Sequence, residues 1–164
     1  GDAEGFYGGT DPDDNSGVLR YVRVWYGGSI IGLDNEINGI TLAGVGRGTV
    51  VDHVEVAYNL DDGIEFFGGT VDAKYLSALF CGDDGIDIDE GYQGRLQYLY
   101  VMTGSIGHHA AEIDGQGAGS DPVSFPQVYN ALFVGNELAK TRSASTDDEE
   151  RALLRLREGT GGMF

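Results

Sequence analysis

The sequence predicts an all-β protein, a right-handed parallel β-helix (a solenoid) of about five coils. One phrase recurs along the chain. Residues 61–66 read Asp-Asp-Gly-Ile-Glu-Phe, residues 83–88 read Asp-Asp-Gly-Ile-Asp-Ile, and residues 109–114 read His-Ala-Ala-Glu-Ile-Asp. The first two copies start 22 residues apart. A period in the low twenties is typical of a coil whose turns bury their apolar faces only against each other.

Two families of short segments carry a strand pattern, since they are rich in β-branched or aromatic residues and bounded by Gly, Asp or Asn. The first family covers residues 18–26, 50–58, 71–80, 95–102 and 127–134. The second covers residues 39–42, 63–67, 85–89, 110–114 and 153–157. Parallel strands normally need a helical crossover, and no helical pattern separates most of these segments. We therefore expect a coil, right-handed by the general preference of parallel crossovers.

Successive segments align in columns, which predicts parallel pairing in register. Two columns of the second family are Ile40, Ile64, Ile86, Ala111 and Leu154, and Leu42, Phe66, Ile88, Ile113 and Leu156. Between them lie Thr41, Glu65, Asp87, Glu112 and Arg155. Because side chains alternate along a strand, the first two columns should face inward and the third outward. In the first family, the outward residues Arg20, Asp52 and Lys74 alternate in sign.

Two stretches interrupt the period within a predicted single domain over residues 1–164. Residues 27–38 lengthen the first coil, and residues 136–151 form a loop insertion in the last one. Residues 1–16 are expected to be an irregular N-terminal segment.

The C-terminal region allows two predictions. Residues 146–149 read Thr-Asp-Asp-Glu, which fits a helix capping box and suggests a helix over residues 147–158. We favour a short helical turn at most, because residues 154–159 superpose on residues 86–91. The last coil carries no polar cap, which predicts a fragment of a longer solenoid or an open end that a partner or a second copy covers.

Composition limits the partners. No apolar run approaches the roughly 18 residues that a membrane helix needs, so no transmembrane segment is expected. The formal net charge of -17 repels phosphate backbones and excludes nucleic acid as a partner, while it suits solubility, cations or basic partners. The single cysteine, Cys81, excludes an internal disulfide.

Acidic side chains gather on one flank of the predicted coils: Asp61, Asp62, Asp83, Asp84, Glu65, Asp87 and Glu112. Three interpretations stay open. Asp before Gly is a turn former. Calcium takes six to eight oxygen ligands, so Asp61, Glu65, Asp87 and Glu112 are candidate calcium ligands, although no cofactor is required. Carboxylates on coils about 4.8 Å apart also approach the separations found in glycosidases.

The histidines and aromatic residues have equally open interpretations. His108 and His109 fall where other coils carry paired aspartates, either as polar corner residues or as imidazoles beside carboxylates. His53 shares a column with three tyrosines, which indicates an exposed or stacked aromatic position. The following residues form either ladders or a sugar-stacking face: Trp25, Tyr26, Tyr58, Phe80, Tyr92, Tyr98 and Tyr100.

With these phrases the chain resembles right-handed β-helix proteins of the pectin-lyase-like class. Residues 35–42, 61–70 and 157–162 look like recurring phrases of a broad group of uncharacterised secreted or lipid-anchored bacterial β-helix proteins. That resemblance spans nearly the whole chain and implies an extracellular or cell-surface location, with no established reaction.

A second resemblance is to polygalacturonases, whose motifs Asn-Thr-Asp, Gly-Asp-Asp, Gly-His-Gly and Arg-Ile-Lys occur in that order. Here residues 59–62, 82–84, 107–109 and 155–157 read Asn-Leu-Asp-Asp, Gly-Asp-Asp, Gly-His-His and Arg-Leu-Arg. The resemblance implies the catalytic residues Asp62, Asp83, Asp84 and His109, with Arg155 and Arg157 binding a uronate carboxylate. The chain departs from the pattern in three places: Leu replaces Thr, the second Gly of the His motif is missing, and Arg replaces Lys.

Two functions follow from the sequence. The favoured one is a non-catalytic extracellular or cell-surface module for adhesion, assembly or glycan contact, with glycans, surface proteins or further copies of the chain as partners. The alternative is a glycoside hydrolase that acts on an acidic polysaccharide, as the polygalacturonase resemblance implies. Fold alone does not decide between them.

Overall fold

The structure is a computed structural model that describes residues 7–32, 35–115, 121–136 and 152–164. Its strands, with no helix among the described residues, fall into long and short sets. The long strands are β1 (Val18–Trp25), β5 (Val50–Ala57), β7 (Ala73–Leu79), β9 (Arg95–Met102) and β11 (Gln127–Val134). The short strands are β4 (Ile40–Ala43), β6 (Ile64–Phe67), β8 (Ile86–Asp89), β10 (Ala111–Ile113) and β12 (Leu154–Leu156).

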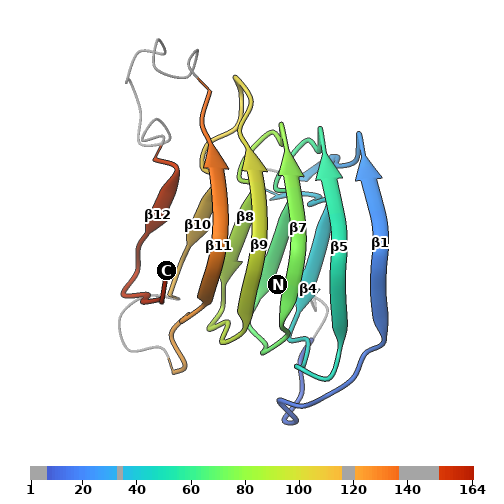
Figure 1. Ribbon diagram of the computed structural model, residues 1–164, viewed down its shortest axis with the longest axis vertical. Helices are drawn as coiled ribbons and strands as arrows, with labels where there is room; N and C mark the ends of the chain where they lie inside the picture. The colour runs from blue at the N-terminus through green and yellow to red at the C-terminus, as the bar shows by residue number, and fades with distance from the viewer. Residues whose placement is uncertain (1–6, 33–34, 116–120, 137–151) are drawn as a thin grey trace.

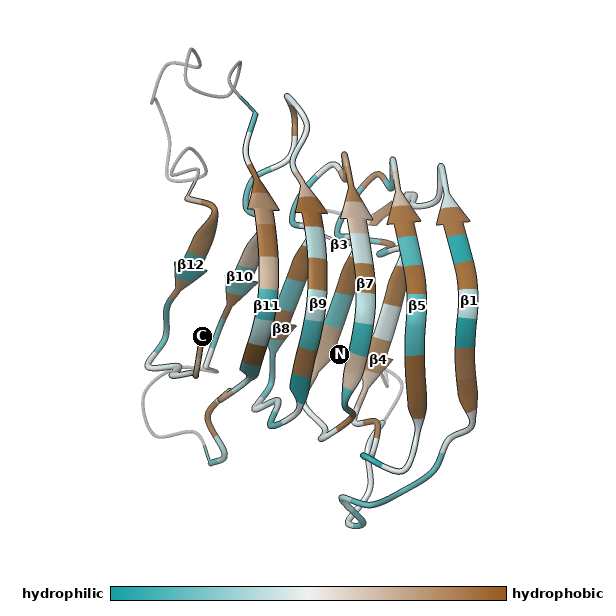
Figure 2. Ribbon diagram, viewed as in Figure 1, coloured by the Kyte–Doolittle hydropathy of each residue, from teal (hydrophilic) through white to brown (hydrophobic). Residues whose placement is uncertain are grey.

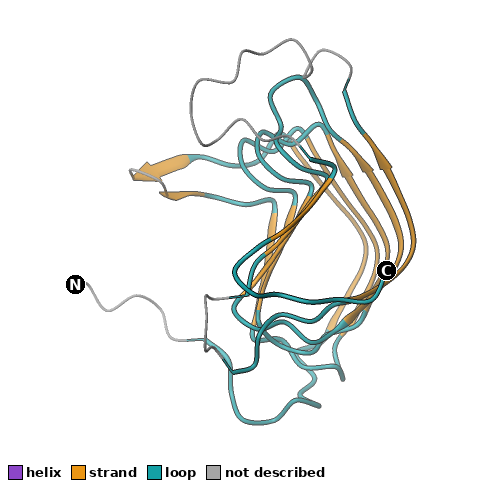
Figure 3. Ribbon diagram, turned by 90° about the vertical axis from the view of Figure 1, so that its left-hand side faces the viewer, coloured by secondary structure: helices purple, strands orange, loops and turns teal. Residues whose placement is uncertain are grey.

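The two sets form two parallel sheets, ordered β1-β5-β7-β9-β11 and β12-β10-β8-β6-β4. The chain alternates between them, so each coil contributes one long and one short strand (Figure 1). Figure 3 shows the sheets on opposite sides of a shared interior. This is the right-handed parallel β-helix that the repeat predicted, with both strand families confirmed.

The predicted register is confirmed residue by residue in the short-strand sheet. Ile64 pairs with Ile40 on one side and Ile86 on the other, and the column continues through Ala111 to Leu154. Hydrophilic and hydrophobic bands alternate along the long strands (Figure 2). One register thus places every inward column in the same interior.

The core is densest in the middle coils. Ile64, Phe66, Leu76 and Ile88 are each no more than 1% exposed, and burying such a side chain contributes about 1.5–3 kcal/mol. Leu156, expected inside, is 47% exposed because its strand β12 lies at the edge of the sheet.

Each long strand bends at one residue with a left-handed backbone, and the sequence analysis missed this feature. The five bend residues are Tyr21, His53, Tyr75, Tyr98 and Asn130, with φ from 52° to 60°. They are skipped in the pairing of neighbouring strands, so the bends stack in register. Bulky residues rarely adopt this conformation, which costs about 1–2 kcal/mol per residue.

The two interruptions have different outcomes. Within 27–38 the chain forms an antiparallel hairpin of β2 (Ile30–Gly32) and β3 (Asn35–Glu36), which projects away from the coils (Figure 3). Residues 137–151, with the predicted capping box, lie outside the described residues. From residue 152 onward the chain forms strand β12 and no helix. No helix in the described ranges is long and apolar enough to cross a membrane.

Candidate functional site

Asp62, Asp84 and His109 occupy one column, two residues before each short strand. The backbone N–H of Asp84 donates to Oδ1 of Asp62 at 2.9 Å, and the backbone N–H of His109 donates to Oδ1 of Asp84 at 2.7 Å. The three residues are 8%, 3% and 2% exposed. Asp62 and Asp84 therefore each tie their own coil to the next one, through a bond between coils that turn propensity alone does not predict.

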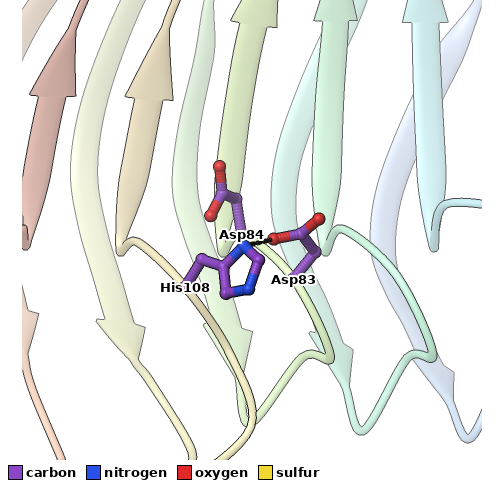
Figure 4. A group of neighbouring side chains, drawn as sticks. All are labelled: Asp83, Asp84 and His108. Carbon is purple, nitrogen blue, oxygen red and sulfur yellow. Dashed lines mark ion pairs between the residues drawn. The ribbon is translucent and has the colours of Figure 1, made fainter. Parts of the chain in front are cut away.

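Asp83 and His108 lie one residue earlier and face solvent. Their side chains form an ion pair, with exposed fractions of 42% and 31% (Figure 4). The hydrogen bond to Asp83 raises the pKa of His108, although partial burial acts in the opposite direction. The predicted placement of imidazoles beside carboxylates is thus confirmed for both histidines.

A buried acid–base group forms where Asp84 meets the next coil. Nδ1 of His109 lies 2.9 Å from Oδ1 of Asp84 and 3.3 Å from Oε2 of Glu112. Burial raises the pKa of Asp84 to about 6, while its hydrogen bond with His109 acts against this rise. Burial also acts to raise the pKa of Glu112, but hydrogen bonds from His109 and Asp84 and the charge of Arg157 lower it to about 2. The two carboxyls are therefore separated in acidity, and Asp84 is the weaker acid.

A second carboxyl group consists of Asp62, Glu65 and Asp87, whose oxygens lie within 4.8 Å of one another. Burial, reinforced by neighbouring carboxylates, raises the pKa of Glu65 to about 8 and of Asp87 to about 9, and raises that of Asp62 as well. The column predicted to face outward is mixed in exposure, since Thr41 is exposed but Glu65 is only 6% exposed. Asn38, two residues before β4, donates a hydrogen bond to the buried carboxylate of Glu65.

The predicted calcium ligands are divided between groups. Glu65 and Asp87 join Asp62, whereas Glu112 joins Asp84 and His109. Asp61 joins Asp62 and Asp83 in a third group. Carboxylate oxygens at this spacing suit a hard cation, so calcium binding by these rows stays a prediction.

The two candidate substrate-binding arginines contact carboxylates of the chain itself. Nε of Arg157 lies 2.7 Å from Oε1 of Glu112, and the same nitrogen donates to Asp114 at 2.6–2.7 Å. Nε of Arg155 lies 3.5 Å from Oε1 of Glu112. Asp114, which the sequence analysis did not select, therefore competes with any uronate for Arg157.

The surface hollows lie away from these residues. Three hollows in the described part of the molecule have volumes of about 660, 700 and 470 Å³, and Asp84, His109 and Arg157 line none of them. The first two lie on the outer face of the long-strand sheet, and the third lies beside the turn at residues 68–70.

Two aromatic ladders lie along the long-strand sheet, and they include four of the seven aromatic residues selected from the sequence: Tyr26, Tyr58, Phe80 and Tyr98. Tyr21, His53, Tyr75 and Tyr98 stack with centroids 4.4–4.8 Å apart. Tyr26, Tyr58 and Phe80 stack at 5.1–5.3 Å. Tyr92 is wholly buried against Phe66, so it is not part of a sugar-stacking face. Rings inside a ladder, such as His53, Tyr75 and Tyr58, have a neighbouring ring on each side.

The parallel coils, their repeat and their in-register columns have a counterpart among known families. A family described as the pectate-lyase-like beta helix domain matches residues 2–164. The chain belongs to this family. Comparison with curated proteins and with solved structures finds no match.

Within this pectate-lyase-like β-helix domain, sequence reasoning missed the groove on the long-strand sheet. Its lining includes Arg20, Asp52, Asp72, Lys74 and Arg95. The signal was present in the sign alternation of three of these residues, Arg20, Asp52 and Lys74, along one outward column.

Proposed function

We propose that this domain is a non-catalytic, extracellular or cell-surface module that contacts glycans or other surface proteins. The observation that carries the proposal is the use of the candidate catalytic carboxylates. Asp62 and Asp84 accept backbone N–H groups from the following coil at 2.9 and 2.7 Å. A carboxylate engaged in this way satisfies the backbone of a turn and holds neighbouring coils in register.

Burial supports the same conclusion. Asp84 and His109 are 3% and 2% exposed, so a glycosidic oxygen has no open approach to either side chain. A general acid must come within hydrogen-bond reach of the atom that it protonates. Arg157, which the polygalacturonase resemblance assigns to a substrate carboxylate, contacts Asp114 and Glu112 instead.

One observation favours the alternative, a glycoside hydrolase acting on an acidic polysaccharide. Asp84 and Glu112 adjoin the same imidazole, with pKa values of about 6 and about 2. Two carboxyls whose environments separate their pKa values in this way are a common acid and base arrangement. In that case Asp84 would supply the proton once a movement of the corner exposed it.

Reducing-sugar release from a panel of neutral and acidic polysaccharides distinguishes the two functions. We expect no turnover by the unaltered domain, while polysaccharide binding remains measurable by affinity gel electrophoresis. The variant Asp84→Asn removes the acidic proton and keeps an acceptor oxygen, and Glu55→Gln, in β5 of the other sheet and outside the first hollow, is its control. Turnover by the unaltered domain that Asp84→Asn abolishes and Glu55→Gln preserves would overturn the proposal and establish the hydrolase.

A further inference from the structure

A groove crosses the outer face of the long-strand sheet, on the half of each strand that precedes the bend. It has a volume of about 660 Å³ and draws lining residues from all five long strands or the turns before them. Neighbouring strands in a sheet lie about 4.8 Å apart. A linear ligand lying along the solenoid axis would therefore meet an equivalent position on each coil in turn.

Four of the five charged side chains of the groove are held in two arginine–aspartate pairs. Nε of Arg20 donates to both oxygens of Asp52 at 2.9 Å, and Nε of Arg95 donates to both oxygens of Asp72 at 3.0 Å. Side-chain exposure is 7% for Asp52 but 48% for Arg20 and 61% for Arg95. A guanidinium has five N–H donors in a fixed plane. The donors that do not bond to the aspartate are therefore held in fixed directions toward the groove.

The charge balance of the groove differs from that of the whole chain. The chain has a formal net charge of -17, whereas the groove contains three cations and two carboxylates. Two of the cations are already neutralised by Asp52 and Asp72. A polyanion would gain little from this set and would meet repulsion from the chain as a whole. An uncharged ligand rich in hydroxyl groups suits it better, because hydroxyls both donate and accept hydrogen bonds.

Tyr129 supplies an apolar surface in the same groove. It is 40% exposed, and its hydroxyl donates to Oε1 of Gln127 at 2.9 Å, which orients the ring. Among the described residues no ring stacks on it, in contrast to the ladder rings. An aromatic face next to a few directed polar groups is the common composition of a small-ligand site.

We propose that this groove binds an uncharged polysaccharide strand along the solenoid axis. The guanidinium groups of Arg20 and Arg95 and the ammonium of Lys74 donate to its hydroxyls, and Tyr129 stacks on a sugar ring. The inference rests on the proposed glycan contact and assigns it a face and a ligand class.

Affinity gel electrophoresis tests the groove with galactomannan and mixed-linkage β-glucan as neutral polymers and polygalacturonate as an acidic one. The double variant Lys74→Gln/Tyr129→Ala alters the groove, and Tyr58→Ala removes a tyrosine of similar exposure that follows β5 and lies outside it. We expect the dissociation constant for a neutral polymer to rise about tenfold in the double variant and to stay within about twofold in Tyr58→Ala. The dissociation constant of the unaltered domain for a neutral polymer should be nearly constant between 50 and 500 mM salt, because salt screens only interactions between charges.

The outcomes separate the two proposals. If the domain binds a neutral polymer and the double variant retains that binding, the groove proposal is overturned and the proposed module function stands. Binding to polygalacturonate alone, weakened by salt, likewise overturns the ligand class. Absence of binding to every polymer overturns both the groove and the proposed glycan contact. Unchanged urea midpoints for the variants exclude misfolding as the cause of any loss.

Discussion

The two sheets of this coil are built from the same repeat but present opposite kinds of outer face. On the short-strand sheet, the acidic side chains are largely buried and the corner pair is bonded to backbone amides of the next coil. On the long-strand sheet, charged and aromatic side chains lie open to solvent and line the first two hollows. The candidate catalytic residues Asp62, Asp84 and His109 are thus residues that hold the coils together.

Asp84 and Asp72 make this difference measurable, since each accepts a backbone N–H from the following coil. Oδ1 of Asp84 accepts from His109 at 2.7 Å, and Oδ1 of Asp72 accepts from Arg95 at 2.9 Å. The first bond is buried, whereas the Asp72 side chain is 35% exposed. Removing a buried acceptor leaves its N–H donor without a partner and destabilises the fold. At an exposed site, water can take the place of the lost acceptor.

The first prediction follows from that pair and carries the largest effect. Asp84→Ala should lower the free energy of unfolding by about 1–3 kcal/mol, and Asp72→Ala by no more than about 1 kcal/mol. Asp84→Asn, which keeps an acceptor oxygen, should fall between them. Urea unfolding followed by circular dichroism measures all three. Equal losses for the two alanine variants would show that burial does not distinguish the faces.

The second prediction concerns pH and applies to the short-strand sheet alone. The folded pKa values of Glu65 and Asp87, about 8 and about 9, lie above the values of unfolded chains. Their contribution to the free energy of unfolding is therefore fully present below about pH 4 and is lost as pH rises through 8 to 9. For Glu112 the pH dependence has the opposite sign. Because its pKa is lowered in the folded state, its carboxylate stabilises the fold above about pH 4.5, and this stabilisation is lost as pH falls toward 2.

Between pH 5 and 9, in buffer with a chelator, the free energy of unfolding should thus fall. The expected fall exceeds about 1.4 kcal/mol, the equivalent of one pKa unit. Asp87→Asn should flatten this slope, whereas Asp72→Asn on the opposite sheet should leave it unchanged. A flat profile for the unaltered domain would mean that the carboxyl group of Asp62, Glu65 and Asp87 is ionised in the folded state.

Much of the fold follows from the sequence because a parallel coil requires the same side-chain type at the same place in each turn. Ile64, Ile86 and Leu154 could be aligned by eye, and their strands pair in that register. Burial of the outward carboxylates could not be predicted this way, because alternation gives the face on which a side chain lies and not its contacts there, such as the hydrogen bond from Asn38 to Glu65.

The bends of the long strands correspond to a break in the two-residue alternation of inward side chains. Inward residues Val51 and Val54 are three positions apart rather than two, and Leu96 and Leu99 repeat the interval. An extra residue in each strand accounts for that interval. Its left-handed backbone was not predictable, because tyrosine, which occupies three of the five bend positions, has little intrinsic tendency to adopt it.

The smallest predicted effect compares two left-handed positions, one whose side chain is exposed and one whose side chain is stacked between other rings. Glu90 has φ of 55° and is exposed, and the equivalent residue of the preceding coil is Gly68 with φ of 61°. Tyr75 has φ of 57°, but its ring is stacked at 4.4 Å on His53 and at 4.8 Å on Tyr98. Both residues carry the same backbone cost, and only the tyrosine has contacts that offset it.

Glycine relieves the left-handed conformation at either position but loses conformational entropy on folding. Glu90→Gly should therefore raise the free energy of unfolding by about 0.5 kcal/mol. Tyr75→Gly should lower it by about 1 kcal/mol, because each aromatic pair contributes about 0.5–1.5 kcal/mol. Urea midpoints of the two variants, measured side by side, give the signs. A gain at Tyr75 would mean that ring stacking does not hold the bends of the long-strand sheet, and that backbone pairing alone maintains the coil there.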